Sequence, residues 1–167
     1  MGCRRLLKPG FMLECANPDP DMIQAIVQIS DHVPDLRMVI DHLPRATLPI
    51  DEHARGEYWS HLNTLTQHRN IFVKFSEIPE LLNGQLQRDV EYYQHSLDAI
   101  CHVFGENHII FGSDWSNRDH VASFADTLRI VPAYVSPKGA ALCEKFFWKN
   151  SLAAYGWKKR TPEQPPR

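Results

Sequence analysis

The sequence has no stretch of the roughly 18 consecutive apolar residues that a membrane-spanning helix needs. An excess of charge of one sign is missing as well, because 18 lysines and arginines stand against 20 aspartates and glutamates. The resulting net charge of −2 provides no electrostatic reason to bind nucleic acid or an anionic membrane surface. We therefore expect neither of these partners.

Cysteine is scarce, and its spacing excludes two common cysteine sites. No two of the four cysteines lie close enough together for a zinc knuckle or a CxxC redox motif; they are Cys3, Cys15, Cys101 and Cys143. We expect reduced thiols that behave as small buried hydrophobes, in a cytoplasmic protein. The glycine-rich loop that binds phosphate in many nucleotide-binding proteins is also missing from the sequence.

Short apolar runs alternate with amphipathic segments along most of the chain. The runs predict four parallel strands near residues 11–16, 36–42, 71–76 and 108–113, in sequential order and with helices packed on one side. Between them, one helical pattern places Tyr58, Leu62 and Leu65 on one face, and another ends at Gly105. After the last strand we expect a shorter helix around 120–130 and a longer one that begins at Ser136-Pro137 and buries Leu142, Phe146 and Phe147.

Strands that are apolar on both faces and alternate with helices predict an α/β domain with a parallel sheet. Four such units fit either an open doubly wound sheet or about half of a TIM (β/α) barrel. Polar residues at the ends of three runs favour the partial barrel, because barrel enzymes draw their catalytic groups from several strand ends. We expect one domain over residues 1–158 and a disordered, proline-rich tail over residues 159–167.

A complete barrel needs about 250 residues, so this chain supplies roughly four of eight units. Half a barrel leaves two open sheet edges and an unclosed core. We expect the inward-facing residues of the first strand, around Leu13 and Cys15, to lack partners. An exposed apolar face of this kind favours self-association, so the sequence also predicts a homo-oligomer.

Two residues at strand ends are candidates for chemistry. His42 ends VIDH, and its imidazole can bind a metal or polarise a carbonyl group, or it can simply be a hydrogen-bonded loop residue. Asp114 in FGSDW can bind a metal or accept a proton from an attacking water, or it can cap a turn. We expect Gly112 to let the backbone turn closely there, and Asp41 to point away from His42.

Three further polar residues are less decisive. Lys74 and Ser76 share one face of the run VKFS, and a lysine within so apolar a strand is costly unless it is paired. Its partner can be Asp114, Glu14 or a substrate, unless it lies on an edge strand and reaches water. Arg45 lies in the loop after His42, where it can bind an anionic substrate or remain solvated.

Taken together, these motifs resemble the amidohydrolase-related family, and within it the lactonase-like group. The family pattern contains a strand that ends in DH, then VKLSG, then FGSDWP, then NA--LY. The matching stretches are PDLRMVIDHLP, NIFVKFSE, FGENHIIFGSDWS and FFWKNSLAAYGW. The resemblance spans about residues 11–158, and the order and spacing of all four blocks agree.

The resemblance implies a hydrolase with a small-molecule substrate, a lactone or a related carbonyl compound. It implies that His42 polarises the reacting carbonyl group or helps to hold a metal, and that Asp114 activates the hydrolytic water. The cofactor implied is either one divalent metal such as zinc, with His42 and Asp114 among its ligands, or none. The candidate substrate-binding residues are Lys74, Ser76, Arg45 and Trp115.

Two departures from the family pattern matter. The HxH pair of the family's opening strand has no counterpart, and Ser116 replaces the proline after FGSDW. Two alternatives therefore stay open: a catalytically inactive half-barrel that acts as an interaction or assembly fragment, and an unrelated open-sheet α/β binding domain.

Overall fold

The computed structural model describes residues 11–16, 18–45 and 51–164. Four strands form a parallel sheet in the order β1-β2-β3-β6. They are β1 (Met12–Cys15), β2 (Arg37–Ile40), β3 (Ile71–Phe75) and β6 (Ile109–Phe111). The prediction of four parallel strands in sequential order is confirmed. A small antiparallel hairpin, which the sequence pattern did not indicate, consists of β4 (Leu81–Leu82) and β5 (Gln85–Leu86).

Helices follow each strand of the sheet. The α-helices are α1 (Pro20–His32), α2 (Glu52–Leu65), α3 (Val90–Phe104), α4 (Phe124–Thr127), α5 (Ile130–Val135), α6 (Ala140–Glu144) and α7 (Asn150–Ala154). Shorter helical turns are the 3₁₀ segments Leu43–Arg45 and Ser136–Lys138 and the π-helical segment Lys145–Lys149. None of the helices in the described part of the chain combines the length and the apolar character that crossing a membrane requires.

Local sequence signals explain where the long helices begin and end. The side chain of Asp19 accepts a hydrogen bond from the backbone N–H of Met22 at 2.8 Å and so caps α1. Helix α3 ends at Gly105, whose φ of 67° is a conformation that glycine adopts without steric cost.

The C-terminal helical region is more broken than the sequence pattern predicted. Helix α4 covers only four residues, and the expected long helix stops after one turn at Gly139, where φ is 109°. The chain then continues through α6, the π-helical segment and α7. Of the residues that we expected this region to bury, Phe146 is buried, while Leu142 and Phe147 are only partly buried.

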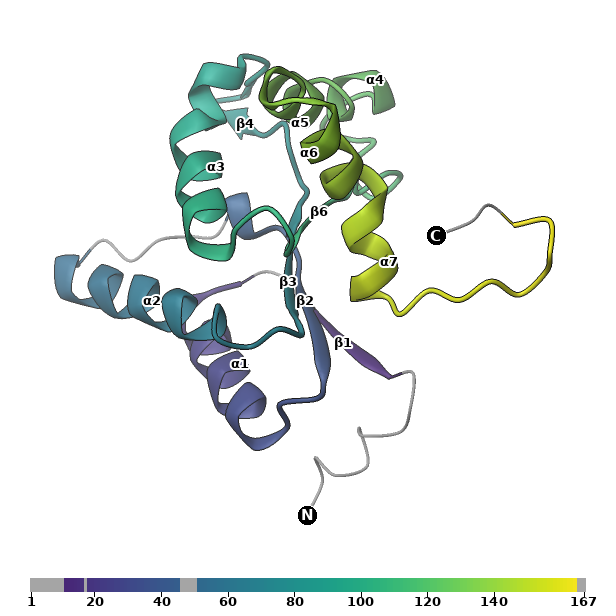
Figure 1. Cartoon of the computed structure of the whole chain (residues 1–167). Coiled ribbons are helices and arrows are strands. Elements are labelled where there is room, and N and C mark those ends of the chain that lie inside the picture. The colour runs from purple at the N-terminus through teal and green to yellow at the C-terminus, as the bar shows by residue number, and fades with distance from the viewer. Residues whose placement is uncertain (1–10, 17, 46–50, 165–167) are drawn as a thin grey trace.

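The main core lies between the sheet and the long helices. Alternate residues of β3, namely Ile71, Val73 and Phe75, face this core and are at most 2% exposed. Residues Tyr58 and Leu62 of α2 pack into the same core, as predicted. Figure 1 shows α1, α2 and α3 together on this side of the sheet, which we call the outer face.

The other side of the sheet, the inner face, is also covered, contrary to the expectation that helices would pack on one side only. Val39, Phe72 and Ile110 form a second apolar cluster with Ala154 of α7. In Figure 1, α7 lies across the sheet from α1 and α2. Among the described residues no further strand packs against this face, so the short helix α7 can cover it.

The orientation expected for the first strand was wrong. Leu13 and Cys15 pack against the main core on the outer face, whereas Met12 lies with the inner cluster. Their side chains therefore have partners, and the predicted self-association stays a prediction.

The cysteines that the structure describes are free thiols, as predicted. Cys15, Cys101 and Cys143 are all partly buried, and burial raises the pKa of Cys15 and Cys101. Cys3 lies outside the described residues. Residues 158–164 form no helix or strand, and the disorder expected for the tail stays a prediction.

Candidate active site

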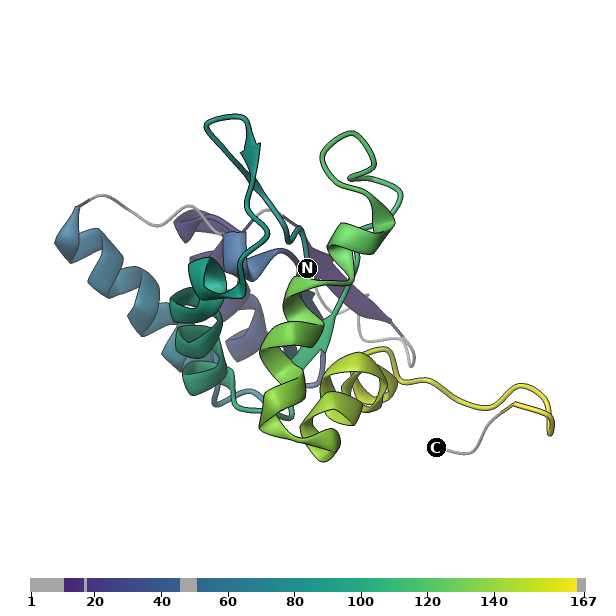
Figure 2. The same ribbon diagram turned by 90° about the horizontal axis from the view of Figure 1, so that it is seen from above.

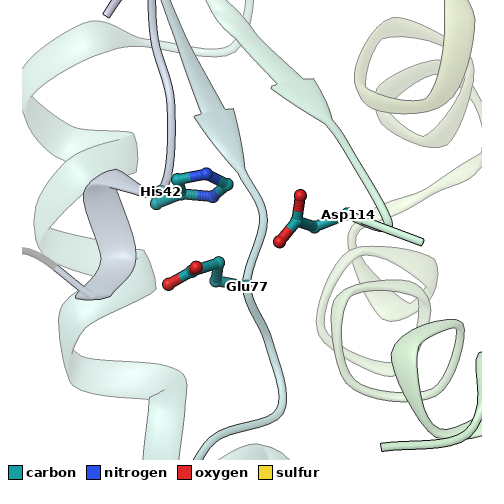
Figure 3. A group of neighbouring side chains, drawn as sticks. All are labelled: His42, Glu77 and Asp114. Carbon is teal, nitrogen blue, oxygen red and sulfur yellow. The ribbon is translucent and has the colours of Figure 1, made fainter. Parts of the chain in front are cut away.

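The carboxyl ends of three neighbouring strands bring together one histidine and two carboxylates. His42 follows β2, Glu77 follows β3 and Asp114 follows β6, and their donor atoms all lie within 4.8 Å of one another. Figure 3 shows the His42 ring and the Asp114 carboxylate facing each other, with Glu77 beside them. The two residues that the sequence singled out at strand ends are therefore neighbours in space.

The same three residues share an uncommon backbone conformation. Their φ angles are 59° for His42, 59° for Glu77 and 53° for Asp114; in the described chain, Asn83 is the remaining non-glycine residue with positive φ. Such conformations cost free energy and cluster at functional sites, where the surrounding structure enforces them. Repetition of the conformation at three adjacent strand ends indicates a site at this edge of the sheet.

The hydroxyl of Ser76 contacts both the imidazole and the backbone of His42. Its Oγ lies 2.8 Å from Nδ1 of His42 and accepts a hydrogen bond from the backbone N–H of His42 at 3.1 Å. The side chain is 1% exposed. The hydroxyl therefore contacts the histidine, and its expected role in substrate binding stays a prediction.

The Asp114 carboxylate has one oxygen for which the described residues supply no partner. Its Oδ2 is buried and has no hydrogen-bond partner in the described part of the chain. A buried carboxylate oxygen without a partner is costly, so its retention indicates a ligand or a proton at that position.

Glu77 is the site residue that sequence reasoning missed. Its carboxylate lies 3.7 Å from Nη1 of Arg118, a nearly buried side chain whose Nη2 donates to the carbonyl of Pro79 at 2.7 Å. One signal was available: Glu77 occupies the position at which the family pattern VKLSG has glycine. A charged residue at the family's glycine position, directly after a strand, indicates a candidate functional residue.

Lys74 lies next to the site but is already paired. Its Nζ is 2.5 Å from Oε1 of Glu14 and 2.7 Å from Oδ1 of Asp41, and the hydroxyl of Tyr155 donates to Glu14 at 2.8 Å. Of the partners considered from the sequence, Glu14 is therefore present. Asp41 shares this lysine with Glu14, and its expected orientation away from His42 stays a prediction.

Gly112 gives Lys74 the space to reach these carboxylates. A Cβ at position 112 would lie 2.7 Å from Cδ of Lys74. The φ angle of Gly112 lies outside the positive range, so the glycine is needed for close packing and not for the tight turn that we expected.

The electrostatics of this ion cluster keep the lysine charged. Burial lowers the pKa of Lys74, but its hydrogen bonds to Asp41 and Glu14 outweigh burial and raise the pKa. Burial raises the pKa of Asp41 despite the nearby lysine. Burial also acts to raise the pKa of Glu14, but its bonds to Lys74 and Tyr155 prevail and lower it. The cluster is thus a charged layer between the apolar part of the inner face and the site.

Trp115 and Arg45 are the last two predicted substrate-binding residues, and the structure describes the side chain of Trp115 only. Trp115 directly follows Asp114, is 47% exposed, and stacks at a tilt on Phe124 with 5.6 Å between ring centroids. The side chain of Arg45 lies outside the described residues. Figure 2 shows hairpin β4–β5 and the loop between β6 and α4 both projecting beyond the helices on the same side of the molecule.

Comparison with known proteins agrees with this geometry. The model of the amidohydrolase family matches residues 16–157, which is most of the chain. The chain belongs to the amidohydrolase family. Its sheet order and its helices are those of a partial TIM barrel, as in the solved amidohydrolases that it resembles.

One curated relative is L-fucono-1,5-lactonase from Burkholderia ambifaria, which is 31% identical over 115 residues. That match covers 64% of this chain and 36% of the relative. Amidohydrolase 2 from Bifidobacterium longum subsp. infantis superposes with a TM-score of 0.70 at 20% identity, over 94% of this chain and 54% of that one.

Two other solved structures are similar in fold. A Burkholderia multivorans amidohydrolase with bound zinc has a TM-score of 0.66 at 18% identity, over 84% of this chain and 52% of that one. A Pseudomonas putida protein, proposed to be a 2-pyrone-4,6-dicarboxylic acid hydrolase, has a TM-score of 0.65 at 22% identity, over 88% and 52%. The chain thus spans about a third of the curated relative and about half of each solved one.

Proposed function

We propose that this chain provides the C-terminal half of the active site of a hydrolase that opens a lactone ring. The observation that carries the proposal is the convergence of His42, Glu77 and Asp114 at the carboxyl ends of three neighbouring strands. TIM-barrel enzymes place their chemistry at this end. The similarity to a lactonase supports the substrate class.

In this proposal Asp114 is the general base. Its carboxylate accepts a proton from water as the water oxygen forms a bond to the lactone carbonyl carbon. The ring C–O bond then breaks, and the proton passes to the departing alkoxide oxygen, which leaves a hydroxy acid. The buried Oδ2, which has no partner in the described chain, is suited to hold such a proton.

His42 would act on the carbonyl group during the same step. An imidazole N–H that faces the site can donate to the carbonyl oxygen and stabilise the negative charge that develops there. Ser76 fixes the orientation of the ring, so the donor is preorganised before the substrate binds.

A divalent metal is compatible with the same residues. One imidazole nitrogen and two carboxylates are a donor set that zinc accepts in catalytic sites, and the unpartnered Oδ2 of Asp114 points to a missing ligand. A metal held by His42, Glu77 and Asp114 would lower the pKa of a bound water and polarise the carbonyl group. The proton transfers assigned to Asp114 do not depend on it.

Trp115 is the residue best placed to contact substrate beside Asp114. Its exposed ring, backed by Phe124, offers an apolar surface for one side of a sugar lactone or pyrone ring. Arg45 stays a candidate for a substrate carboxylate. Lys74 is less suited to that role, because two carboxylates already neutralise it.

The test is a panel of aldonolactones and a pyrone dicarboxylate, assayed by release of acid, with and without a chelator. Asp114→Asn should lower kcat by on the order of 100-fold or more, because the base is lost while the shape is kept. Asp98→Asn is the matched control, since Asp98 is exposed and bonds Tyr134 and Lys138 away from the site. Sensitivity to chelator in wild type would assign the metal.

The turnover rate of the isolated chain distinguishes a hydrolase from an inactive half-barrel. We expect turnover far slower than that of a full-length relative, since groups from both barrel halves position the substrate. Equal residual rates in wild type and Asp114→Asn would contradict the proposal and favour an inactive half-barrel with an assembly role.

A further inference from the structure

The buried hydroxyl of Ser76 has both of its hydrogen bonds to one residue. Its Oγ lies 3.1 Å from the backbone nitrogen of His42 and 2.8 Å from Nδ1 of the same residue. In the described part of the chain, Ser76 has no other hydrogen-bond partner, and its side chain is 1% exposed. Ser76 has a single hydroxyl proton, so one of these two bonds must provide an acceptor for it.

Counting protons decides the direction of the second bond. A backbone N–H can only donate, so Oγ accepts from the backbone of His42. The hydroxyl proton then needs an acceptor, and Nδ1 is one only if it carries no proton. A buried hydroxyl proton without an acceptor costs about 1–3 kcal/mol. The satisfied arrangement therefore has Ser76 donating to an unprotonated Nδ1.

We propose that Ser76 is a positioning residue that holds neutral His42 in the tautomer protonated at Nε2. This inference rests on the proposed function and sharpens it, because it chooses between the two roles open to His42. The Nε2–H group is then the ring N–H that is left to donate to a substrate carbonyl oxygen. Binding a metal through Nε2 requires the proton to move to Nδ1 and leaves the Ser76 hydroxyl without an acceptor.

The same arrangement has a consequence for a metal. Ser76 disfavours His42 as a zinc ligand, so a bound metal would depend mainly on Glu77 and Asp114. The zinc affinity of Ser76→Ala does not test this point, because the substitution removes both the unsatisfied hydroxyl and the oxygen that accepts from an Nδ1–H group.

The primary experiment is long-range ¹H–¹⁵N NMR of the chain with ¹⁵N-labelled histidine, at a pH where imidazole is neutral. The spectrum shows directly which ring nitrogen carries the proton, and His42→Gln identifies the His42 signals among the nine histidines. Wild type and Ser76→Thr should show His42 protonated at Nε2 with Nδ1 hydrogen-bonded. Ser76→Ala should lose the hydrogen-bonded shift of Nδ1 and the preference for this tautomer.

Protonation of His42 at Nδ1 in wild type would overturn the inference. Unchanged signals from the other histidines control for folding. A wild-type chain with the expected tautomer but no lactone hydrolysis would refute the proposed function and leave the tautomer assignment intact.

Activity gives a second readout. Under the proposed mechanism Ser76→Ala should lower kcat by about 10-fold with little change in KM, and Ser76→Thr should restore it. Equal kcat values in all three proteins would show that the tautomer does not serve catalysis.

Discussion

The two faces of the same sheet have very different roles. On the outer face, β3 contributes Ile71, Val73 and Phe75, which are all apolar and almost fully buried against helices. On the inner face, the intervening residues change from Phe72 through the ion-paired Lys74 to the buried Ser76 beside His42. One strand therefore supplies the core with every second residue and the site with the others.

The difference shows how stability and chemistry are kept apart. The outer face is uniform because each side chain contributes by removing apolar surface from water. The inner face is graded along the strand: an apolar layer against α7, then the charged layer of Lys74, Glu14 and Asp41, then the candidate active site at the carboxyl end. Substitutions on the two faces should accordingly differ in kind.

Phe75→Ala tests the outer face and should have the largest effect on stability. Phe75 is fully buried, with ring centroids 5.6 Å from Phe146 and 6.4 Å from Tyr134. Removing such a ring from a core costs about 3–5 kcal/mol of unfolding free energy. Urea unfolding measures it, and Phe124→Ala, at an exposed ring, is the control. A loss below about 1 kcal/mol, the scale of a minor core change, would mean that the core rearranges freely.

Lys74→Met tests the charged layer of the inner face. It keeps much of the side-chain volume but leaves the carboxylates of Glu14 and Asp41 facing each other without a cation. We expect a loss of about 2–3 kcal/mol at neutral pH, less than for a fully buried pair because Glu14 is half-exposed. Lys158→Met, at an exposed lysine, should change little.

The loss caused by Lys74→Met should also depend on pH. The pKa of Glu14 lies below its usual value in the folded protein, so its stabilising contribution is present above pH 4.5 and fades as pH falls. The difference between wild type and Lys74→Met should therefore shrink as pH is lowered from 7 to about 3, where carboxylates take up protons. A pH-independent difference would assign the loss to packing instead of charge.

Gly112→Ala should have the smallest effect on stability. The sign of that effect tests whether the inner face is closely packed at this position. The new Cβ would meet the Lys74 side chain, which its two carboxylates hold in place, so we expect a loss of about 1 kcal/mol, at the low end of overpacking. Gly56→Ala is the matched change in α2, with no atom within 4 Å of the new Cβ, and should stabilise by about 0.5–1 kcal/mol. Thermal unfolding of both variants measures this contrast. If both changes stabilise, close packing does not explain Gly112.

Much of this protein follows from the sequence by itself. The alternation of apolar runs and amphipathic segments predicts the parallel strands and their order, since both depend on local periodicity and short connections. The same alternation places His42 and Asp114 at strand ends, and carboxyl ends of adjacent parallel strands lie at one edge. Residue parity within VKFS likewise places Lys74 and Ser76 on one face.

Only the tertiary structure decided which residues the polar side chains of the inner face contact. Lys74 is 60 residues from Glu14 in the chain, and Ser76 is 34 residues from His42, so no local pattern fixes either contact. The sequence also gave no sign that α7 would cover the inner face, or that Glu77 would join the site in a left-handed conformation. Periodicity determines which face a side chain occupies, whereas its partner depends on how distant segments pack around it.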